Sequence, residues 1–203
     1  MSESAIISII RKFALKNSEK DDIHGFLHVE RVYKTCINIG KKIGANILVL
    51  KISALLHDIG RIKEKENSYN TNHAQISSEM ALNFLKSNNF KISQENIDNI
   101  IHCIKAHSFS NKTNPKTIEA KILSDADKLD AIGAIGLYRT IGYTVKNNGG
   151  IDQVIEHLEN KIMKLKDQLY LDVSKKFAKD RQQIILDFYN KIRSEKKYFK
   201  KPI

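Results

Sequence analysis

The stretch Ala-Leu-Leu-His57-Asp58-Ile-Gly60 (residues 54–60) places a histidine beside an aspartate, directly after an apolar run and just before a glycine. This pattern predicts the C-terminal end of a buried helix, because glycine commonly follows the last helical turn. A carboxylate at such a place is costly unless it is paired or holds a cation. For an isolated His-Asp dipeptide, a hydrogen-bonded pair in the core is the ordinary interpretation, so the rest of the chain has to decide.

The composition indicates a helical globular domain. The chain has 203 residues, 41% of them hydrophobic, with only two prolines and nine glycines. These values suit one domain rich in long helices. The clearest break is Asn-Asn-Gly-Gly at residues 147–150. We therefore expect one all-α domain over residues 1–203, with a helical core in residues 1–146. Residues 151–203 are expected to form helices that pack on this core, as a subdomain or lid.

Apolar residues recur at helical spacing along the chain, and no stretch alternates as a strand would. Asp21 or Asp22 is a candidate N-cap of the second helix, and Asn46, Ser93 and Thr117 are candidate caps of later helices. The expected elements are helices near residues 6–17, 21–43, 46–60, 74–86, 93–107, 117–136, 155–169 and 177–192, with polar loops at residues 61–72 and 111–115.

The net charge of +11 raises the possibility of nucleic-acid binding. Residues 161–203 contain 13 Lys and Arg against 5 Asp and Glu, so this segment accounts for 8 of the 11 charges. The basic residues are spread along amphipathic helices and do not cluster with aromatic residues. A solvated lysine-rich face is the preferred interpretation, followed by general attraction of anionic substrates, while nucleic acid stays open as a partner.

The sequence gives no sign of a membrane segment or an export signal. No apolar run approaches the roughly 20 residues that span a bilayer, and the N-terminus lacks a signal-peptide pattern. We expect a cytoplasmic protein with no membrane partner. Cys36 and Cys103 both lie on apolar helical stripes, which favours reduced core thiols over a disulfide.

Six of the seven histidines lie before residue 110. Helical spacing places His28 at the edge of a buried stripe and His107 on the inner face of its helix. Asp127 lies among small and apolar residues. Inward histidines and aspartates from different helices suit a divalent ion such as Mn, Fe, Co, Ni, Zn or Mg. No thiolate joins them, so we expect an open site that water or substrate completes.

The order of these residues resembles the H…HD…D signature of the HD-domain metal-dependent phosphohydrolases. His28 supplies the first histidine, His57-Asp58 the pair, and Asp127 the last aspartate. The resemblance continues into residues 161–181 and so covers most of the chain. Its motifs are similar to those of a small bacterial and archaeal branch resembling nucleotide pyrophosphohydrolases: His24-x3-His28-x2-Arg31-Val32, residues 54–60, His73-Ala74 and the run from Asp125 to Ala134.

The resemblance implies that His28, His57, Asp58 and Asp127 bind one divalent metal ion per chain. His57 and Asp58 would then be catalytic, since such an ion lowers the pKa of a bound water and offsets phosphoryl charge. Adjacent residues of a helix point about 100° apart, so both can bind one ion only where the helix end approaches it closely. A helix end just before Gly60 allows this.

Five further residues are candidates for binding substrate phosphate. His73 and His107 stand where bimetallic relatives hold a second metal and other relatives contact phosphate, and a satisfied core histidine is the third interpretation. Arg61 and Lys128 are fixed cations next to the expected ligands, with ordinary surface roles as the alternative. His24 either binds phosphate, supports a ligand, or is simply a capped histidine at a helix start.

The resemblance implies hydrolysis of a small phosphorylated substrate, with nucleotides as the best match. The reaction would convert a (d)NTP to NMP and pyrophosphate, or a nucleoside monophosphate to the nucleoside. No Gly-rich phosphate loop is present to decide between them. The alternatives are a cyclic nucleotide or cyclic dinucleotide phosphodiesterase and a non-catalytic HD module that binds nucleotide or RNA. A monomer and a homodimer both fit the sequence.

Overall fold

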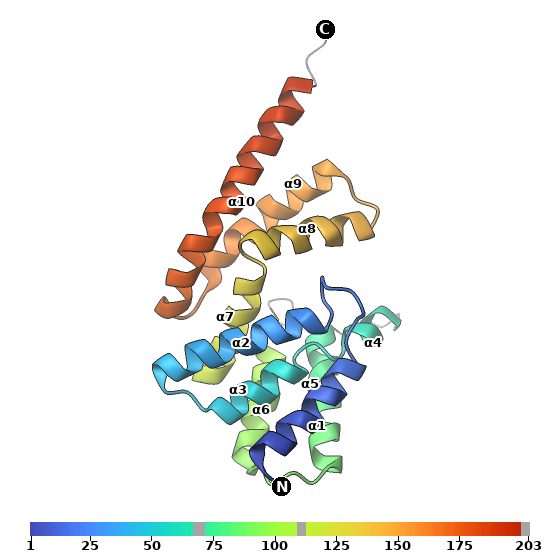
Figure 1. The fold of residues 1–203 in the computed structure, drawn as a ribbon, viewed down its shortest axis with the longest axis vertical. Coiled ribbons are helices and arrows are strands. Elements are labelled where there is room, and N and C mark those ends of the chain that lie inside the picture. Colours follow the sequence, from blue (N-terminus) through green and yellow to red (C-terminus); the bar gives the residue numbers. More distant parts are fainter. Residues whose placement is uncertain (67–71, 109–112, 200–203) are drawn as a thin grey trace. The chain divides into compact units, whose positions relative to one another are not determined.

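The computed structural model describes residues 1–66, 72–108 and 113–199, which form helices and their connections, with no strand among them. The all-α prediction is confirmed (Figure 1). In chain order the elements are α1 (Glu3–Lys16), α2 (Phe26–Ile43), α3 (Ile47–Leu56), α4 (Arg61–Glu66), α5 (His73–Ser87), α6 (Gln94–Ala106), α7 (Ile118–Asp130), α8 (Ala134–Lys146), α9 (Ile151–Asn160), the 3₁₀ helix η2 (Ile162–Gln168) and α10 (Asp172–Phe199).

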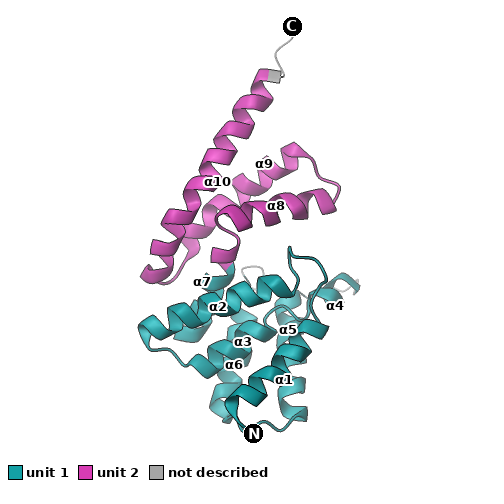
Figure 2. Ribbon diagram, in the orientation of Figure 1, with its two compact units in different colours: residues 1–127 teal, residues 128–203 magenta. Residues whose placement is uncertain are grey.

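The chain divides into two compact units, residues 1–127 and residues 128–203 (Figure 2). The boundary falls inside α7, whereas the break at residues 147–150 joins α8 to α9 within the second unit. A single domain over the whole chain therefore stays a prediction. None of the described helices combines the length and the apolar character needed to cross a bilayer.

α3 forms the centre of the first unit. Most of its residues are apolar, with Lys51 as its charged residue, and a helix of this kind has to be covered on most sides. Contacts with α1, α2, α5 and α6 provide that cover. The side chains of α3 without exposed surface are Val49, Leu50, Ile52, Ser53, Ala54, Leu55 and Leu56. Each large aliphatic side chain buried here contributes roughly 1.5–3 kcal/mol. The burial of α3 places the residues that follow it in the interior of the unit.

The predicted caps Asn46, Ser93 and Thr117 are confirmed, because each side chain accepts a hydrogen bond from the backbone N–H three residues later. Gly44 ends α2 with a φ of 71°, a conformation that glycine adopts without strain. The start of α2 was predicted too early. Asp21 accepts hydrogen bonds from two backbone N–H groups of the turn that precedes α2, so it stabilises that turn and not the helix.

The loop predicted over residues 61–72 was wrong in its first half, where Arg61–Glu66 forms α4. α4 has six residues and buries none of them, so the sequence carries no apolar stripe that could reveal it. Residues 67–71 lie outside the described part of the chain. Of the loop predicted over residues 111–115, residues 113–115 are non-helical, and residues 111–112 also lie outside the described part.

The helix predicted from Thr117 past Gly136 is two helices, α7 and α8. Gly133 separates them with a φ of 97°, which side chains with a Cβ rarely adopt. Gly136 passes so close to Ala131 that a Cβ would lie 2.2 Å from the Ala131 carbonyl. The two glycines therefore form a tight corner between the helices. The prediction that they sit inside one helix was wrong.

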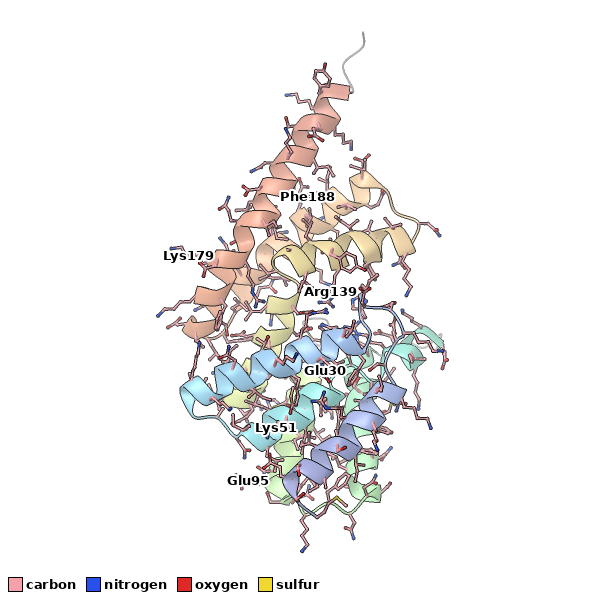
Figure 3. The ribbon with its side chains drawn as sticks, viewed as in Figure 1. Glu30, Lys51, Glu95, Arg139, Lys179 and Phe188 are labelled. Atoms are coloured by element: carbon pink, nitrogen blue, oxygen red, sulfur yellow. The ribbon has the colours of Figure 1, made fainter. Side chains whose placement is uncertain are left out.

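The helix predicted over residues 155–169 changes form at Lys161, where α9 gives way to η2. Three residues per turn keep Ile162 and Leu165 on one buried face, so the apolar spacing suits this tighter helix as well. α10 follows and displays much of the basic character of the chain. Its lysines are largely exposed, and Lys179 points outward from the helix (Figure 3).

Cys36 and Cys103 are free and fully buried, as the sequence predicted. Burial raises the pKa of the Cys36 thiol well above its usual range and that of Cys103 to about 12. Both thiols are therefore protonated at neutral pH and act as small apolar side chains of the core.

Candidate metal centre

The chain leaves α3 through His57, its C-terminal cap, so the helix ends within the predicted stretch but before Gly60, where the sequence predicted its end. It then turns into α4 at Gly60, which donates its backbone N–H to Ser77 Oγ of α5 at 2.9 Å. A Cβ on Gly60 would lie 2.7 Å from both the His73 carbonyl oxygen and the Ser77 backbone nitrogen. Glycine at this position lets the turn lie directly on the first turns of α5.

Four imidazoles surround the carboxylate of Asp58, whose side chain is 1% exposed. Asp58 Oδ2 lies 3.5 Å from Nε2 of His28 and 3.5 Å from Nε2 of His57. Asp58 Oδ1 lies 3.6 Å from Nε2 of His73 and 3.5 Å from Nε2 of His107. The rings come from α2, the end of α3, the start of α5 and the end of α6.

These residues form two sets that share Asp58. The first ligand group is His28, His57 and Asp58, and the second ligand group is Asp58, His73 and His107. Within each group the candidate ligand atoms lie within 4.8 Å of one another. Asp127 reaches the first ligand group, since its Oδ1 lies 3.3 Å from His28 Nε2. The fold thus brings the four residues predicted as metal ligands together.

Hydrogen bonds at Nδ1 fix the tautomers of three rings. His57 Nδ1 lies 2.8 Å from the Ala54 carbonyl oxygen, and His107 Nδ1 lies 2.6 Å from the Ile104 carbonyl oxygen. A carbonyl can only accept, so Nδ1 carries the proton in both rings. His73 Nδ1 lies 3.3 Å from a carboxylate oxygen on α4, with the same consequence. In the neutral form, each Nε2 then presents a lone pair toward Asp58, which is the arrangement of a metal-binding histidine.

The protonation states also suit a metal. Burial alone would raise the pKa of Asp58, but Arg61, whose Nε donates to Oδ2 at 2.5 Å, and then His57 hold it well below its usual range. Burial lowers the pKa of His57 to about 4. Burial would raise the pKa of Asp127, and His28 holds it well below its usual range. Ionised carboxylates and a neutral imidazole are the forms that bind metal ions.

Three atoms of the second ligand group are buried without a hydrogen-bond partner: Asp58 Oδ1, His73 Nε2 and His107 Nε2. Buried polar atoms are nearly always satisfied, and an unmade bond costs about 1–3 kcal/mol. A cation between these atoms would satisfy all three at once. The imidazole and carboxylate donors of the two groups fit a divalent ion such as Mn, Fe, Co, Ni or Zn. The sequence led us to expect one ion, whereas the two groups offer room for a second.

The other predicted site residues are Arg61, His24 and Lys128. Arg61 pairs with Asp58, so it is part of the site and not a free surface cation. His24 lies in the turn before α2, half-buried, and belongs to neither ligand group. Lys128 follows Asp127 on α7 and is buried, with its Nζ 5.2 Å from the ring centroid of Tyr170. A phosphate contact by each of the three remains a prediction.

Sequence reasoning missed Glu64, the α4 residue whose carboxylate contacts His73. Glu64 follows Arg61 by three positions, so both side chains lie on one face of α4. This spacing could have identified Glu64 only if α4 had been predicted, and it was not. One short helix therefore supplies a charged partner to each of two site residues.

Comparison with known proteins gives several matches. YpgQ of Bacillus subtilis is 27% identical over 180 residues, covering 85% of this chain and 84% of YpgQ. The crystal structure of YpgQ in complex with ADP has a TM-score of 0.77 at 28% identity, covering 96% of this chain and 97% of that one. An HD-superfamily hydrolase from Bacillus thuringiensis has a TM-score of 0.72 at 25% identity, covering 96% and 98%.

A third relative, ribonuclease Y of Treponema denticola, is 31% identical over 118 residues, or 58% of this chain and 20% of the relative.

The family model of the ubiquitin-like autophagy protein Apg12 matches residues 126–199, well under half of the chain, and the described residues of that segment contain no strand. The HD domain model matches residues 25–132, which include both ligand groups and Asp127. Because the HD match covers more than half of the chain, this protein belongs to the HD domain family.

Proposed function

We propose that this protein is a divalent-metal-dependent phosphohydrolase that acts on nucleotides. The observation that carries the proposal is the buried Asp58 carboxylate with four imidazole Nε2 atoms within 3.6 Å of it. A purely structural cluster would be expected to satisfy its own polar atoms, and this one leaves three without a hydrogen bond. A non-catalytic HD module would have no need of such a complete donor set.

The first ligand group together with Asp127 would hold the ion. An ion bound there supplies an activated water and offsets charge on the phosphoryl group. His57 stays neutral at physiological pH because its pKa lies near 4, so its Nε2 lone pair is available. Arg61 holds Asp58 in its ionised form and in a fixed orientation. These residues therefore keep the donor atoms ready before substrate arrives.

The proposed reaction is hydrolysis of a nucleoside triphosphate to the monophosphate and pyrophosphate. The water oxygen bonds to the α-phosphorus and releases a proton to solvent. The bond from that phosphorus to the α,β-bridging oxygen breaks, and the bridging oxygen leaves with pyrophosphate. The ADP complex of YpgQ supports a nucleotide as the ligand of this chain. Arg61, Lys128 and His24 are the candidate phosphate contacts, together with the second ligand group. Cleavage of a monophosphate to the nucleoside is the competing reaction of the same class.

A panel of (d)NTPs and (d)NMPs tests the proposal. The protein is loaded with Mn²⁺, Co²⁺, Ni²⁺ or Mg²⁺, and pyrophosphate and inorganic phosphate are measured separately. Pyrophosphate release from a triphosphate is the expected result. Phosphate release from monophosphates would replace the favoured reaction by its competitor. If no product forms with any of the four metals, the hydrolase proposal fails.

A second candidate is hydrolysis of a phosphodiester. The second ligand group favours it, because two adjacent ions can stabilise both the attacking and the leaving oxygen. The similarity to ribonuclease Y extends this candidate to RNA as well as to cyclic nucleotides and cyclic dinucleotides. Including a cyclic dinucleotide and a short RNA in the same panel separates the candidates. Cleavage of either, with two ions per chain by elemental analysis, would favour the phosphodiesterase.

A further inference from the structure

Glu64 makes two contacts with one residue. Its Oε1 accepts a hydrogen bond from the backbone N–H of His73 at 2.7 Å and lies 3.3 Å from His73 Nδ1. The backbone bond holds the carboxylate at the start of α5, beside the ring. A carboxylate oxygen can only accept, so the ring contact requires a proton on Nδ1. The opposite nitrogen, Nε2, then points its lone pair at Asp58 Oδ1, 3.6 Å away.

The position of His73 in its helix explains why a side chain is needed here. His57 and His107 lie at the ends of α3 and α6, and each uses the carbonyl three residues earlier in its own helix. His73 is the first residue of α5, so no preceding turn of that helix offers a carbonyl. Glu64 supplies the missing acceptor from α4.

We propose that Glu64 is a positioning residue of the metal centre. It fixes the tautomer and orientation of His73 and so completes the second ligand group. This inference rests on the proposed function, because the second ligand group matters only if it binds an ion or a phosphate. The neutral His73 held in this way presents a lone pair at Nε2 and suits a metal, whereas the doubly protonated ring, which makes the same contact with Glu64, would donate from Nε2 to a phosphate oxygen.

A role limited to the stability of α5 has to be separated from this one. Glu64 accepts from the first backbone N–H of α5, and Asn72 caps the same helix by accepting from the backbone N–H of Gln75 at 3.1 Å. Asn72→Ala therefore removes a capping bond and leaves the Glu64–His73 contact in place. It is the matched control for Glu64→Ala. Glu64→Gln keeps an amide oxygen that accepts from Nδ1–H, so it is the conservative variant.

The experiment is ¹⁵N NMR of the histidine side chains in the full-length, metal-free protein, with the His73 signals assigned by their loss in His73→Gln. In the wild type, Asn72→Ala and Glu64→Gln, we expect His73 with its proton on Nδ1. In Glu64→Ala, we expect the form protonated on Nε2 to appear. Titration with Mn²⁺ gives a second readout, with about 10–100-fold weaker binding at the second ligand group in Glu64→Ala and less than about twofold in Asn72→Ala.

If His73 in Glu64→Ala keeps its proton on Nδ1, as in the wild type, the proposal is overturned. Equal effects of Glu64→Ala and Asn72→Ala on the tautomer and on Mn²⁺ binding would overturn it as well. The NMR readout does not depend on turnover. If the tautomer shifts as expected but the wild type hydrolyses no phosphorylated substrate, the proposed function fails and the positioning role of Glu64 stands. If hydrolysis is found and the tautomer does not shift, the proposed function stands and the positioning role of Glu64 fails.

Discussion

The two ligand groups share Asp58 but are supported in different ways. His28 and His57 of the first group are fully buried and come from α2 and from the end of the largely apolar α3. His73 of the second group is slightly exposed and is held through Glu64 on α4, a six-residue helix that buries no residue. The core of the unit therefore fixes the two histidines of the first group, whereas His73 of the second group depends on a short surface helix. We expect the first group to tolerate little change and the second to be tunable.

Removing the shared residue should have the largest effect. Asp58→Ala deletes a ligand from both groups, so we expect loss of bound metal and at least about a thousandfold lower kcat/KM. Elemental analysis and the nucleotide assay measure the two effects, and circular dichroism checks that the variant is folded. Asp98→Ala, which removes an exposed carboxylate on α6, is the control and should retain both properties. Turnover above about a tenth of the wild type in Asp58→Ala would contradict the shared role.

Substituting one imidazole in each group tests the asymmetry directly. His28→Gln should lower kcat/KM by about a hundredfold or more and deplete the first ion. His107→Gln should lower it by about tenfold and leave the first ion bound, because its ring belongs to the second group alone. The metal-to-protein ratio and kcat/KM, measured for both variants, test whether the two groups differ. An equal loss in the two variants, or a larger loss in His107→Gln, would show that the groups do not differ in this way.

The pKa of His57 predicts a pH dependence of stability. Burial lowers the pKa of His57 from 6.5 to about 4. Below pH 6.5 the unfolded state therefore binds a proton at this residue that the folded state does not bind. The free energy of unfolding of the metal-free protein should therefore fall between about pH 6.5 and pH 4, by roughly 3 kcal/mol from this residue. Urea unfolding of wild type and His57→Gln at several pH values isolates the contribution. A stability difference between the two proteins that does not change with pH would disprove it.

His24 should give the smallest effect, since it belongs to neither ligand group. If its ring contacts substrate phosphate, His24→Ala should raise KM for the nucleotide about fivefold, corresponding to roughly 1 kcal/mol, and change kcat less than about twofold. Steady-state kinetics of the variant provide the measurement. An unchanged KM would assign His24 to the turn before α2 and remove it from the list of phosphate contacts.

Sequence reasoning succeeded where long apolar stripes carried the information. The stripes of α2, α3 and α6 located His28, the end of α3 and the inner face that bears His107. The resemblance then identified Asp127 as the fourth residue of the first site. All four expected ligands lie together, although their binding of a metal stays a prediction.

The failures occurred where local geometry, and not burial, decides the structure. α4 buries nothing, so neither the helix nor Glu64 could be found from apolar spacing. The corner at Gly133 depends on a φ of 97°, which a helical pattern running through that residue does not reveal. The second ligand group was visible only as separate histidines, because no spacing within one helix links His73 to His107.

Anomalous diffraction from Mn²⁺-loaded crystals of the wild type would locate the metal ion proposed for the first ligand group. We predict a peak between Nε2 of both His28 and His57 and the carboxylate oxygens of Asp58 and Asp127, close enough for direct coordination. A second, weaker peak beside His73 and His107 would show that the second ligand group also holds an ion. Absence of a peak at the first ligand group in fully loaded crystals would contradict the account, and so would a sole peak elsewhere in the molecule.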